Sequence, residues 1–401
     1  MKLLFVADGR SPIALNWMRW WIEKGYEVHL ASTFACDPIP GLAGLDLTPV
    51  AFSGAKSSPV SGSKSASGLW GARTLGLRQK IRQWIGPLTI SRSAKRLREK
   101  IERVQPDLVH ALRIPYEGML AAEAISALEN PPPLLVSIWG NDFTLHAPSS
   151  PLMRHYTEWT VSVADAIHAD CRRDIRLARQ WSFPTDRPTF VAPGNGGIRS
   201  DVFYPSAEPV TAPVVLNPRG FRGYVRNDTF FQSIPKVLAK RPEARFLCAS
   251  MAGEPQALNW IDQLGIHASV ELLPALPHHE MAELFRSAAV LVSPSTHDGT
   301  PNTLLEGMAC GCFPVAGDLE SIREWITPGV NGLLVDPSDP DSLAAAILSA
   351  LNQPDLRMKA AEENRRIISE RAEYGQNMAR AETFYTRLIQ NKRETGMPSL
   401  K

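Results

Sequence analysis

The sequence predicts an α/β protein made of two domains, each with a doubly wound parallel β-sheet. The chain has 401 residues, which exceeds one ordinary domain and suits two domains of roughly 200 residues each. Short apolar runs without internal charge, typical of strands covered on both faces, alternate with segments of helical periodicity. This alternation recurs in both halves of the chain, and strand–helix–strand units give parallel sheets.

Composition and charge narrow the class of protein. The net charge of +2 argues against a nucleic-acid binder. Five scattered cysteines argue against a disulfide framework and for a reducing compartment. The opening MKLLFVADGR is too short in apolar residues for a signal peptide, and no stretch reaches the roughly 18 apolar residues of a membrane span. We therefore expect a cytoplasmic protein.

The first half begins with a strand, a helix and a second strand. The helix is expected to open at Ser11-Pro12, because Trp17, Trp20 and Trp21 then recur at helical spacing. The turn before it, DGRSP, is not GxGxxG, so a dinucleotide fingerprint is absent. Asp174 is expected to open a later helix. The strands of this half are expected at residues 3–7, 28–31, 107–111, 134–139 and 164–169.

Charge is most uneven between Lys56 and Arg103, where twelve Lys or Arg stand against two acids. A flexible Ser/Gly/Lys-rich loop at 52–69 precedes the apolar part of this segment. A basic, apolar segment over 70–103 would be attracted to an anionic membrane, each cation contributing about 1 kcal/mol. A solvated helix face whose aromatic side chains pack inward explains the same pattern. The interleaved apolar residues are Trp70, Leu75, Leu77, Ile81, Trp84 and Ile85.

The second half repeats the alternation after a Gly- and Pro-rich linker that ends near Pro213. A further helix is expected to begin in SIREWI, residues 321–326, and the final helices are expected over 360–388. Asp339-Pro340-Asp341 spells DxD, but a helix N-cap with an acid in the first turn explains it better than a metal site. The remaining strands are expected at 214–217, 245–249, 270–273 and 288–292, and helices at 229–241 and 279–288.

The densest group of chemical side chains lies in HDGTPNTLLEGMACGCFPV, residues 297–315. Gly299 and Pro301 mark a sharp turn, and Pro301 suits the first position of a helix. The free amides around Asn302, Thr303 and Leu304 would then meet an anion such as phosphate at the carboxyl edge of the sheet.

Two acids flank this helix start. Glu306 follows within about one and a half turns, and Asp298 precedes it by eight residues. Carboxylates on both sides of a phosphate cradle suit a ligand with hydroxyls at each end, which is the chemistry of a nucleotide sugar.

This stretch resembles the signature of glycosyltransferase family 4, whose acidic pair is written E-x7-E; here the first acid is Asp298. SIWGND resembles the family's HG-x-D/E segment, with Trp139 where many members have histidine, so no catalytic histidine is named. VAPGNGGIRSDVFYP resembles the family's crossing between domains. In PRGFRGYVRND, Arg219 matches an arginine that grips the diphosphate; the following lysine is missing, and Arg222 and Arg226 are candidate substitutes.

The resemblance implies the GT-B fold, with two Rossmann-like domains facing across a cleft. The acceptor domain would span residues 1–195, with a C-terminal helix at about 378–401 packing back on it, and the donor domain would span 196–377. Asp142 is expected to orient the sugar or the acceptor, although a helix or turn cap is the alternative. The implied catalytic residues are Asp298, Glu306, Arg219 and Asp142, and the implied donor-binding residues are Arg222, Gly299, Thr300, Pro301, Asn302, Thr303 and Gly9.

The function implied is a retaining, metal-independent transfer of a hexosyl group to an acceptor hydroxyl. The donor would be UDP- or GDP-linked, with no other cofactor and no metal. The acceptor would be a sugar or a lipid-linked sugar in surface polysaccharide, glycolipid or glycoconjugate synthesis, handled at the inner face of the membrane. The alternatives are a nucleotide-sugar 2-epimerase of the same fold and a catalytically weak nucleotide-sugar-binding protein.

Overall fold

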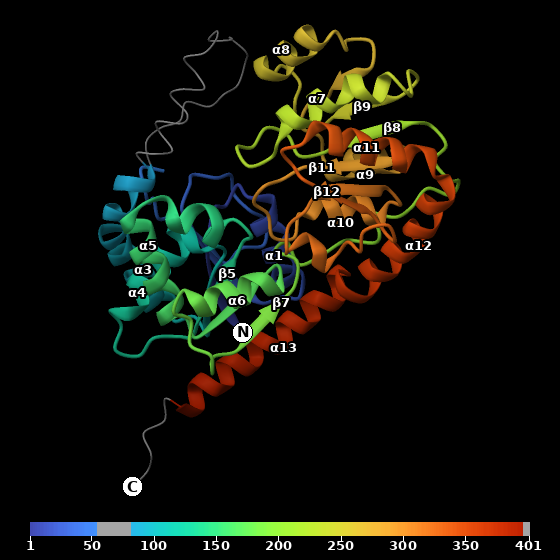
Figure 1. Ribbon diagram of the computed structural model, residues 1–401. Coiled ribbons are helices and arrows are strands. Elements are labelled where there is room, and N and C mark those ends of the chain that lie inside the picture. Colours follow the sequence, from blue (N-terminus) through green and yellow to red (C-terminus); the bar gives the residue numbers. More distant parts are fainter. Residues whose placement is uncertain (54–81, 396–401) are drawn as a thin grey trace. The chain divides into compact units, whose positions relative to one another are not determined.

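The computed structural model describes residues 1–53 and 82–395. The chain divides into two compact units, Met1–Gly196 with Met378–Lys401, and Gly197–Asn377. Each unit contains one parallel sheet flanked by helices (Figure 1). Among the described helices, none has the length and apolar character to span a membrane. The predicted α/β class with parallel sheets is confirmed.

The sheet of the first unit has seven parallel strands in the order β3-β2-β1-β4-β5-β6-β7. The chain starts in the middle and winds outward on both sides, which is the doubly wound arrangement. The strands are β1 (Lys2–Ala7), β2 (Glu27–Ser32), β3 (Gly44–Leu47), β4 (Leu108–Ala111), β5 (Leu134–Ile138), β6 (Ala166–Ala169) and β7 (Thr189–Val191).

The five strands predicted for this half are confirmed to within two residues, whereas the edge strands β3 and β7 were not predicted. Both are short, and β3 alternates between half-buried and exposed residues. An edge strand of this kind lacks the continuous apolar run that identifies a central parallel strand.

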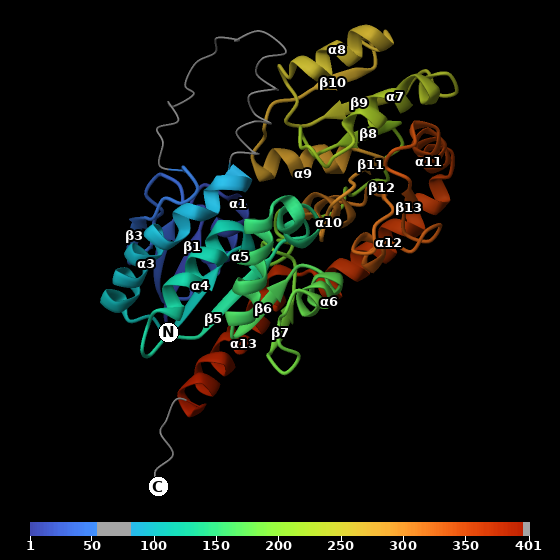
Figure 2. The same cartoon turned by 60° about the vertical axis from the view of Figure 1, so that its left-hand side comes forward.

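Helices cover both faces of the first sheet. α3, α4 and α5 lie side by side over one face (Figure 2), where Leu4 and Val6 point into the apolar core. On the other face, Trp21 of α1 stacks on Tyr385 of α13 with ring centroids 4.2 Å apart. The helical segments are α1 (Pro12–Glu23), η1 (Gly86–Thr89), α3 (Ile90–Val104), η2 (Ile114–Gly118), α4 (Met119–Ser126), η3 (Asp142–His146), η4 (Ala147–Ser149), α5 (Pro151–Val163), α6 (Arg172–Gln180) and α13 (Tyr374–Thr395).

The predicted start of α1 is confirmed, since Pro12 opens the helix and the Ser11 hydroxyl accepts a hydrogen bond from the Ala14 amide at 3.4 Å. The helix expected to open at Asp174 begins two residues earlier, at Arg172, so that Asp174 lies in the first turn.

A row of buried polar side chains crosses the core of the first unit. Tyr385 accepts a hydrogen bond from Trp17 Nε1 at 2.9 Å and also bonds to His110. The Ser137 hydroxyl lies 2.8 Å from both His110 Nε2 and His168 Nδ1. These groups satisfy one another away from water, so His110 is a core residue.

The second unit has six parallel strands in the order β10-β9-β8-β11-β12-β13. They are β8 (Val214–Asn217), β9 (Arg245–Cys248), β10 (Val270–Leu272), β11 (Val290–Ser293), β12 (Phe313–Gly317) and β13 (Leu333–Val335). The helical segments are α7 (Asn227–Leu238), α8 (Pro255–Leu264), α9 (His278–Ser287), α10 (Asn302–Ala309), η5 (Ile322–Glu324), α11 (Pro340–Asn352) and α12 (Pro354–Arg371).

The prediction that a helix begins in SIREWI is wrong, because the segment forms only the short turn η5. Thr327 precedes Pro328, and a residue before proline is disfavoured in the helical conformation. The Asn331 side chain accepts from the Thr327 amide at 2.7 Å and donates to the Trp325 carbonyl at 2.9 Å, which stabilises the turn.

The interpretation of DPD as a helix cap is confirmed. Asp339 is the N-cap of α11, and its carboxylate accepts from the amides of Asp341 and Ser342 at 2.8 and 3.2 Å.

Close packing places α10 against the sheet. A Cβ on Gly307 would lie 2.6 Å from Leu291 Cδ2, so glycine allows the helix to approach β11. Leu304, Leu305 and Met308 of the same helix are fully buried. The N-terminus of α10 is thereby held at the carboxyl end of β11.

Candidate functional site

The second unit brings Arg219, Asp298 and Thr303 together. Arg219 Nη2 donates to Asp298 Oδ2 at 2.7 Å, and Nη1 donates to Thr303 Oγ1 at 3.3 Å. Arg219 and Asp298 are only 7% and 8% exposed, so the charges depend on each other for compensation. These residues come from the loops after β8 and β11 and from the first turn of α10, as the sequence predicted for a phosphate-binding edge.

Two asparagines that the sequence interpretation missed hold Arg219 in place. Asn217, the last residue of β8, accepts from the Arg219 amide at 3.1 Å and donates to Asn227 Oδ1 at 3.0 Å. Asn227 in turn donates to the Gly220 carbonyl at 2.9 Å. An Asn at the end of the strand and another Asn at the start of the next helix are the signal that could have identified these two residues.

The helix start differs from the prediction by one residue. Pro301 is the N-cap with an extended ψ of 122°, and α10 begins at Asn302. Proline fixes φ but leaves ψ free, so it can precede a helix as well as open one. The Leu304 amide donates to the Pro301 carbonyl at 3.0 Å. Of the three amides expected to face an anion, those of Asn302 and Thr303 are therefore the better placed.

Glu306 lies in the middle of α10 and is only 7% exposed. Burial raises the pKa of its carboxyl to about 7, although the charge of Arg219 opposes the shift. Near neutral pH this group exists in both protonation states, so it can donate or accept a hydrogen bond with a ligand hydroxyl.

The loop between β11 and α10 is tied to the segment around η5. Ser321 Oγ donates to the Asp298 carbonyl at 2.7 Å, and Trp325 Nε1 donates to Thr300 Oγ1 at 2.9 Å. Thr300 thus has a hydrogen-bonding role within the loop, and the predicted contact of Gly299 and Thr300 with a donor stays a prediction. Ser321 and Trp325 lie more than twenty residues away from their partners, and no local pattern marked them.

The two candidate substitutes for the missing lysine differ. Arg226 is paired with Asp228 at 2.7 Å. Arg222 is exposed, with Nη1 3.2 Å from the Tyr224 hydroxyl. Partial desolvation of the guanidinium opposes the shift, yet Tyr224 and the charge of Asp298 raise the pKa of Arg222, which places it within electrostatic reach of Asp298. Arg222 is therefore the better candidate for a phosphate contact.

The two predicted residues of the first unit have structural contacts. The Gly9 amide donates to Ser32 Oγ at 3.0 Å, and a Cβ at this position would lie 2.5 Å from Cys36 Sγ. Asp142 is 1% exposed, and its Oδ2 accepts from the amides of Ile114 and Trp139 at 3.0 and 3.1 Å.

Asp142 therefore caps the turn after β5, as the alternative interpretation described. Burial raises the pKa of Asp142 to about 6 against the opposing charge of Arg113. Its contact with a substrate stays a prediction, as does that of Gly9.

One group of side chains with the composition of a metal site lies elsewhere in the first unit. The ligand atoms of Asp170, Cys171 and Asp174 lie within 4.8 Å of one another. Arg173 approaches Asp174 Oδ1 to 2.8 Å and already supplies a positive charge there. The sequence interpretation did not consider these residues as metal ligands.

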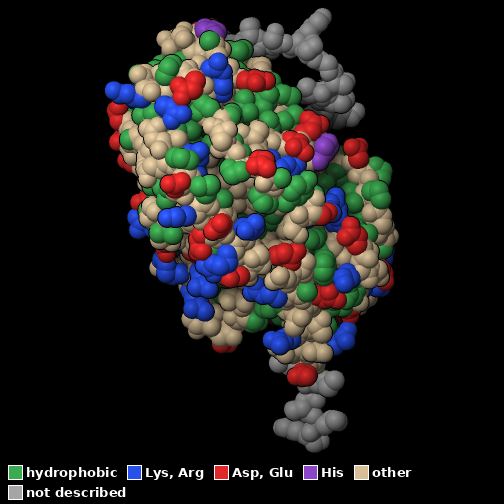
Figure 3. Space-filling view, turned by 90° about the vertical axis from the view of Figure 1, so that its right-hand side faces the viewer, with side chains coloured by type: hydrophobic (Ala, Val, Ile, Leu, Met, Phe, Trp, Pro, Cys, Tyr) green, Lys and Arg blue, Asp and Glu red, His purple; other side chains and the backbone are tan. Residues whose placement is uncertain are grey.

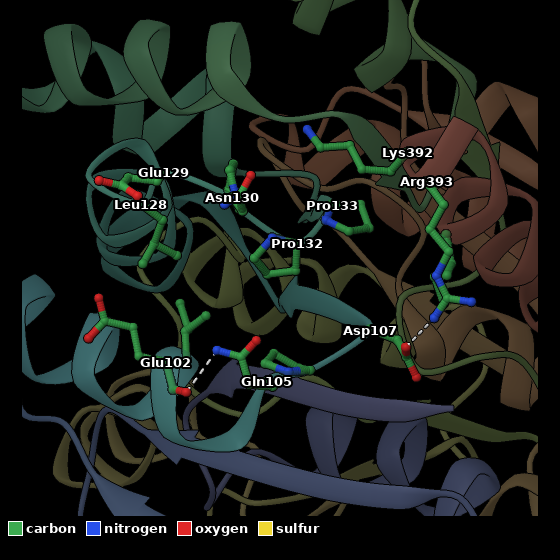
Figure 4. A pocket seen from close by; sticks show the side chains of 14 residues that line it. Glu102, Gln105, Asp107, Leu128, Glu129, Asn130, Pro132, Pro133, Lys392 and Arg393 are labelled. Atoms are coloured by element: carbon green, nitrogen blue, oxygen red, sulfur yellow. Dashed lines mark hydrogen bonds and ion pairs between the residues drawn. The ribbon is translucent and has the colours of Figure 1, made fainter. Parts of the chain in front are cut away.

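A pocket of about 860 Å³ opens at the amino ends of β4 and β5 (Figure 4). Asp107 lies at its edge and accepts from Arg393 Nη2 at 2.6 Å. Ligands of doubly wound sheets bind at the carboxyl ends of the strands. None of the predicted site residues lines this pocket, so we do not place the site there. Figure 3 shows acidic and basic side chains interspersed on one face of the molecule, in keeping with the small net charge.

Two family models match most of the chain between them. The model described as glycosyl transferase 4-like domain matches residues 9–194, and the model described as glycosyl transferases group 1 matches residues 201–367.

Similar curated proteins include D-inositol 3-phosphate glycosyltransferases. The protein of that name from Thermobispora bispora is 29% identical over 218 residues, which cover 49% of this chain and 50% of the relative. The one from Frankia alni is 37% identical over 98 residues, 24% of each chain. The chain spans half or less of the length of these relatives.

Solved structures match over the full length. Sucrose-phosphate synthase from Thermosynechococcus elongatus superposes with a TM-score of 0.74 at 16% identity, covering 98% of this chain and 100% of that one. HepE from Anabaena, in complex with UDP-glucose, has a TM-score of 0.70 at 15% identity and coverages of 98% and 99%. Both likenesses show the fold, and they confirm the predicted GT-B class.

Proposed function

The chain belongs to the family 4-type glycosyltransferases of the GT-B fold, and from that premise we propose that it transfers a hexosyl group from a nucleotide-diphosphate sugar to an acceptor hydroxyl. The proposal includes retention of anomeric configuration and independence from metal ions and cofactors. The observation that carries it is the buried contact of Arg219 with Asp298 and Thr303 at the N-terminus of α10. UDP-glucose in the similar HepE structure supports a nucleotide sugar as donor.

The residues of the second unit would stabilise the departing diphosphate. Guanidinium groups bind phosphate oxygens in bidentate fashion and stay charged at any working pH. Arg219 and Arg222, with the amides of Asn302 and Thr303, would neutralise the charge that grows on the leaving group. Glu306 would hold a ribose or sugar hydroxyl. Asp298 would hold sugar hydroxyls while keeping Arg219 in position.

The acceptor hydroxyl would attack from the face that the diphosphate leaves. A bond forms between its oxygen and the anomeric carbon, the bond from that carbon to the phosphate oxygen breaks, and the hydroxyl proton passes to the departing phosphate. No nucleophile of the enzyme is required. The contribution of the protein is then mainly positioning and charge stabilisation.

A donor panel tests this proposal against the two alternatives. The full chain would be incubated with radiolabelled UDP- and GDP-sugars, and the products separated by chromatography. Hydrolysis or transfer of the label supports a transferase. Formation of an epimer alone would establish the 2-epimerase, and binding without turnover would establish a nucleotide-sugar-binding protein.

We also propose that the protein contacts the inner face of an anionic membrane, where a lipid-linked acceptor for surface polysaccharide or glycoconjugate synthesis would lie. Trp84, Ile85 and Leu88 are 57%, 47% and 64% exposed, so the expectation that the aromatic side chains pack inward is wrong for Trp84. The exposed cations of α3, Arg92, Lys95 and Arg96, follow directly. Trp70, Leu75, Leu77 and Ile81 lie outside the described residues. Exposed apolar groups beside cations are what an anionic bilayer binds.

A further inference from the structure

Three guanidinium groups gather at the carboxyl edge of the first sheet, and we refer to Arg10, Arg82 and Arg113 as the arginine cluster. Arg10 follows β1 and Arg113 follows β4. The Cζ atoms of Arg10 and Arg82 lie 3.8 and 5.1 Å from the centroid of the same ring, Phe34. Arg82 Cζ is also 4.4 Å from the Tyr116 ring centroid. Like charges held on shared aromatic faces produce a local positive potential.

Arg82 and Arg113 each have a hydrogen-bond donor that no acceptor meets. Arg10 is satisfied, since it donates to both carboxylate oxygens of Asp8 at 3.0 and 2.9 Å. The Nε atoms of Arg82 and Arg113 are buried and have no hydrogen-bond partner. Arg113 Nη2 comes only within 3.7 Å of Asp142 Oδ1, which is beyond hydrogen-bonding distance. Buried donors without acceptors are unfavourable, so these two positions favour a ligand that brings acceptor oxygens.

Unsatisfied acceptors lie beside these donors. Glu117 is 3% exposed; its Oε1 accepts from Thr33 Oγ1 at 2.7 Å, and its Oε2 has no hydrogen-bond partner. Asp142 Oδ1 also lacks a hydrogen bond. Electrostatic coupling of Glu117 with both Arg82 and Arg113 places all these groups in one neighbourhood. A ligand that suits them carries hydroxyl donors as well as an oxyanion.

Burial weakens the acidity of the two carboxyl groups beside the arginine cluster. Burial raises the pKa of Glu117 and, to about 6, that of Asp142, so both are less negative than exposed carboxylates would be. Burial, followed by the positive charges of Arg113 and Arg82, lowers the pKa of His146 to about 3.

The backbone at the cluster is strained. Arg113 has φ 142° and Tyr116 has φ 69°, a region that residues with a Cβ rarely adopt. Such residues persist where surrounding structure enforces them and are frequent at ligand sites. Here the strained turn aims Arg113 at the ring of Trp139, with Cζ 5.4 Å from the ring centroid.

We propose that the first unit binds a sugar or polyol that carries a phosphate or carboxylate. The oxyanion lies between Arg82 and Arg113, and Glu117 and Asp142 accept hydrogen bonds from its hydroxyls. Only the identification of this ligand as the glycosyl acceptor rests on the proposed function; binding of the oxyanion is a property of the first unit alone.

Calorimetric titration of the full chain tests the proposal with glucose 6-phosphate, glucuronate and glucose as probes. At least one charged sugar is expected to bind at least tenfold more tightly than glucose. The phosphate and carboxylate arms identify which oxyanion fits. Equal binding of all three sugars, or no binding of either charged sugar, overturns the proposal.

Variants locate the site. Arg113→Gln and Arg82→Gln are each expected to weaken the charged sugar at least tenfold, because each removes one bidentate donor. Arg179→Gln, an exposed position on α6 of the same unit, is the matched control and is expected to bind as the wild type does. Wild-type affinity in both cluster variants would refute the assignment.

Two further measurements separate failure of the oxyanion site from misfolding of a variant and from failure of the proposed function. If Arg113→Gln does not fold, chemical labelling of the wild type replaces it. Bound charged sugar is expected to protect Arg82 and Arg113 from phenylglyoxal, as measured by peptide mass spectrometry. Equal labelling with and without the sugar would count against the site. Turnover of the nucleotide-sugar donor is measured separately. Charged-sugar binding without any donor turnover would refute the proposed function but not the oxyanion site. Donor turnover without charged-sugar binding would refute the oxyanion site but not the proposed function.

Discussion

Arg219 and Asp298 form a buried ion pair in the second unit, with Nη2 and Oδ2 2.7 Å apart. The shorter side chain of aspartate, where the family signature has glutamate, places its carboxylate directly on the guanidinium. The acid that would hold sugar hydroxyls is therefore also the group that positions the arginine for a diphosphate.

Removal of one partner from this pair should cost stability as well as activity. Asp298→Ala is expected to lower the free energy of unfolding by about 3 kcal/mol, because Arg219 would be left buried and uncompensated. Urea denaturation measures this loss. The control is Asp318→Ala, which breaks the exposed Asp318–Arg323 pair and should change stability far less. An equal effect of both variants would contradict the role of burial.

Two substitutions at position 298 should separate the contribution of the carboxylate charge from that of its position. Asp298→Asn keeps the shape but removes the charge, and Asp298→Glu keeps the charge but moves it. If Asp298 positions Arg219, the asparagine variant raises KM for the donor more than it lowers kcat, and the glutamate variant recovers part of the loss. Steady-state kinetics with the donor identified in the panel measures both constants. A glutamate variant as poor as the asparagine variant would show that geometry, and not charge, dominates.

Glu306 should make the second unit more stable at lower pH. Its folded pKa of about 7 lies above the usual value of 4.5 for a free glutamate carboxyl. The folded state therefore binds the proton more tightly, and the stabilisation is complete below pH 4.5 and is lost as pH rises through about 7. The difference in unfolding free energy between wild type and Glu306→Gln, followed from pH 5 to pH 8, should change by about 3 kcal/mol. A difference that does not vary with pH would mean that the carboxyl is ionised throughout.

The same substitution should abolish most activity while the fold survives. Glu306→Gln is expected to lower donor turnover by about a hundredfold or more, since the neutral amide is a weaker hydrogen-bond acceptor than a carboxylate and cannot change its protonation state. Circular dichroism provides the control for folding. Wild-type turnover in the folded variant would exclude Glu306 from the site.

The buried histidines should destabilise the first unit in acid. Burial lowers the pKa of His168 to about 4 and that of His110 well below its usual value. The unfolded chain then binds protons that the folded chain cannot, so stability present above pH 6.5 is lost as pH falls towards 4. His168→Gln should reduce this acid sensitivity, as measured by urea denaturation at pH 7 and pH 5. An unchanged pH dependence would show that the histidines do not control it.

Binding to anionic membranes should depend on the exposed apolar residues before α3. Trp84→Ser with Leu88→Ser is expected to reduce sedimentation with phosphatidylserine vesicles several-fold, because each side chain loses its apolar contact with the bilayer. Wild-type sedimentation should fall as salt rises. Met358→Ser, at a comparably exposed position on α12, is the control. No binding of wild type at low salt would refute the membrane contact.

The sequence by itself determined the α/β class, the central strands and the resemblance to the family. These features are local: an apolar run of four to six residues or a helix cap is set by neighbours in the chain. The signature around Asp298 and Glu306 and the arginine at 219 were found in the same way. Errors in secondary structure fell on short features, such as the edge strands β3 and β7, the turn η5 and the exact start of α10.

Only the tertiary structure decided how the site residues interact. Arg219 and Asp298 are 79 residues apart, and their pairing depends on where β8 and β11 end in the same sheet. The arginine cluster likewise joins loops after β1 and β4 with Arg82, and Glu117 reaches Thr33 across 84 residues. Contacts of this kind follow from the packing of distant segments, and burial then shifts the pKa of Glu306 and Asp142. No pattern along the chain contains that information, because desolvation is produced by the completed fold.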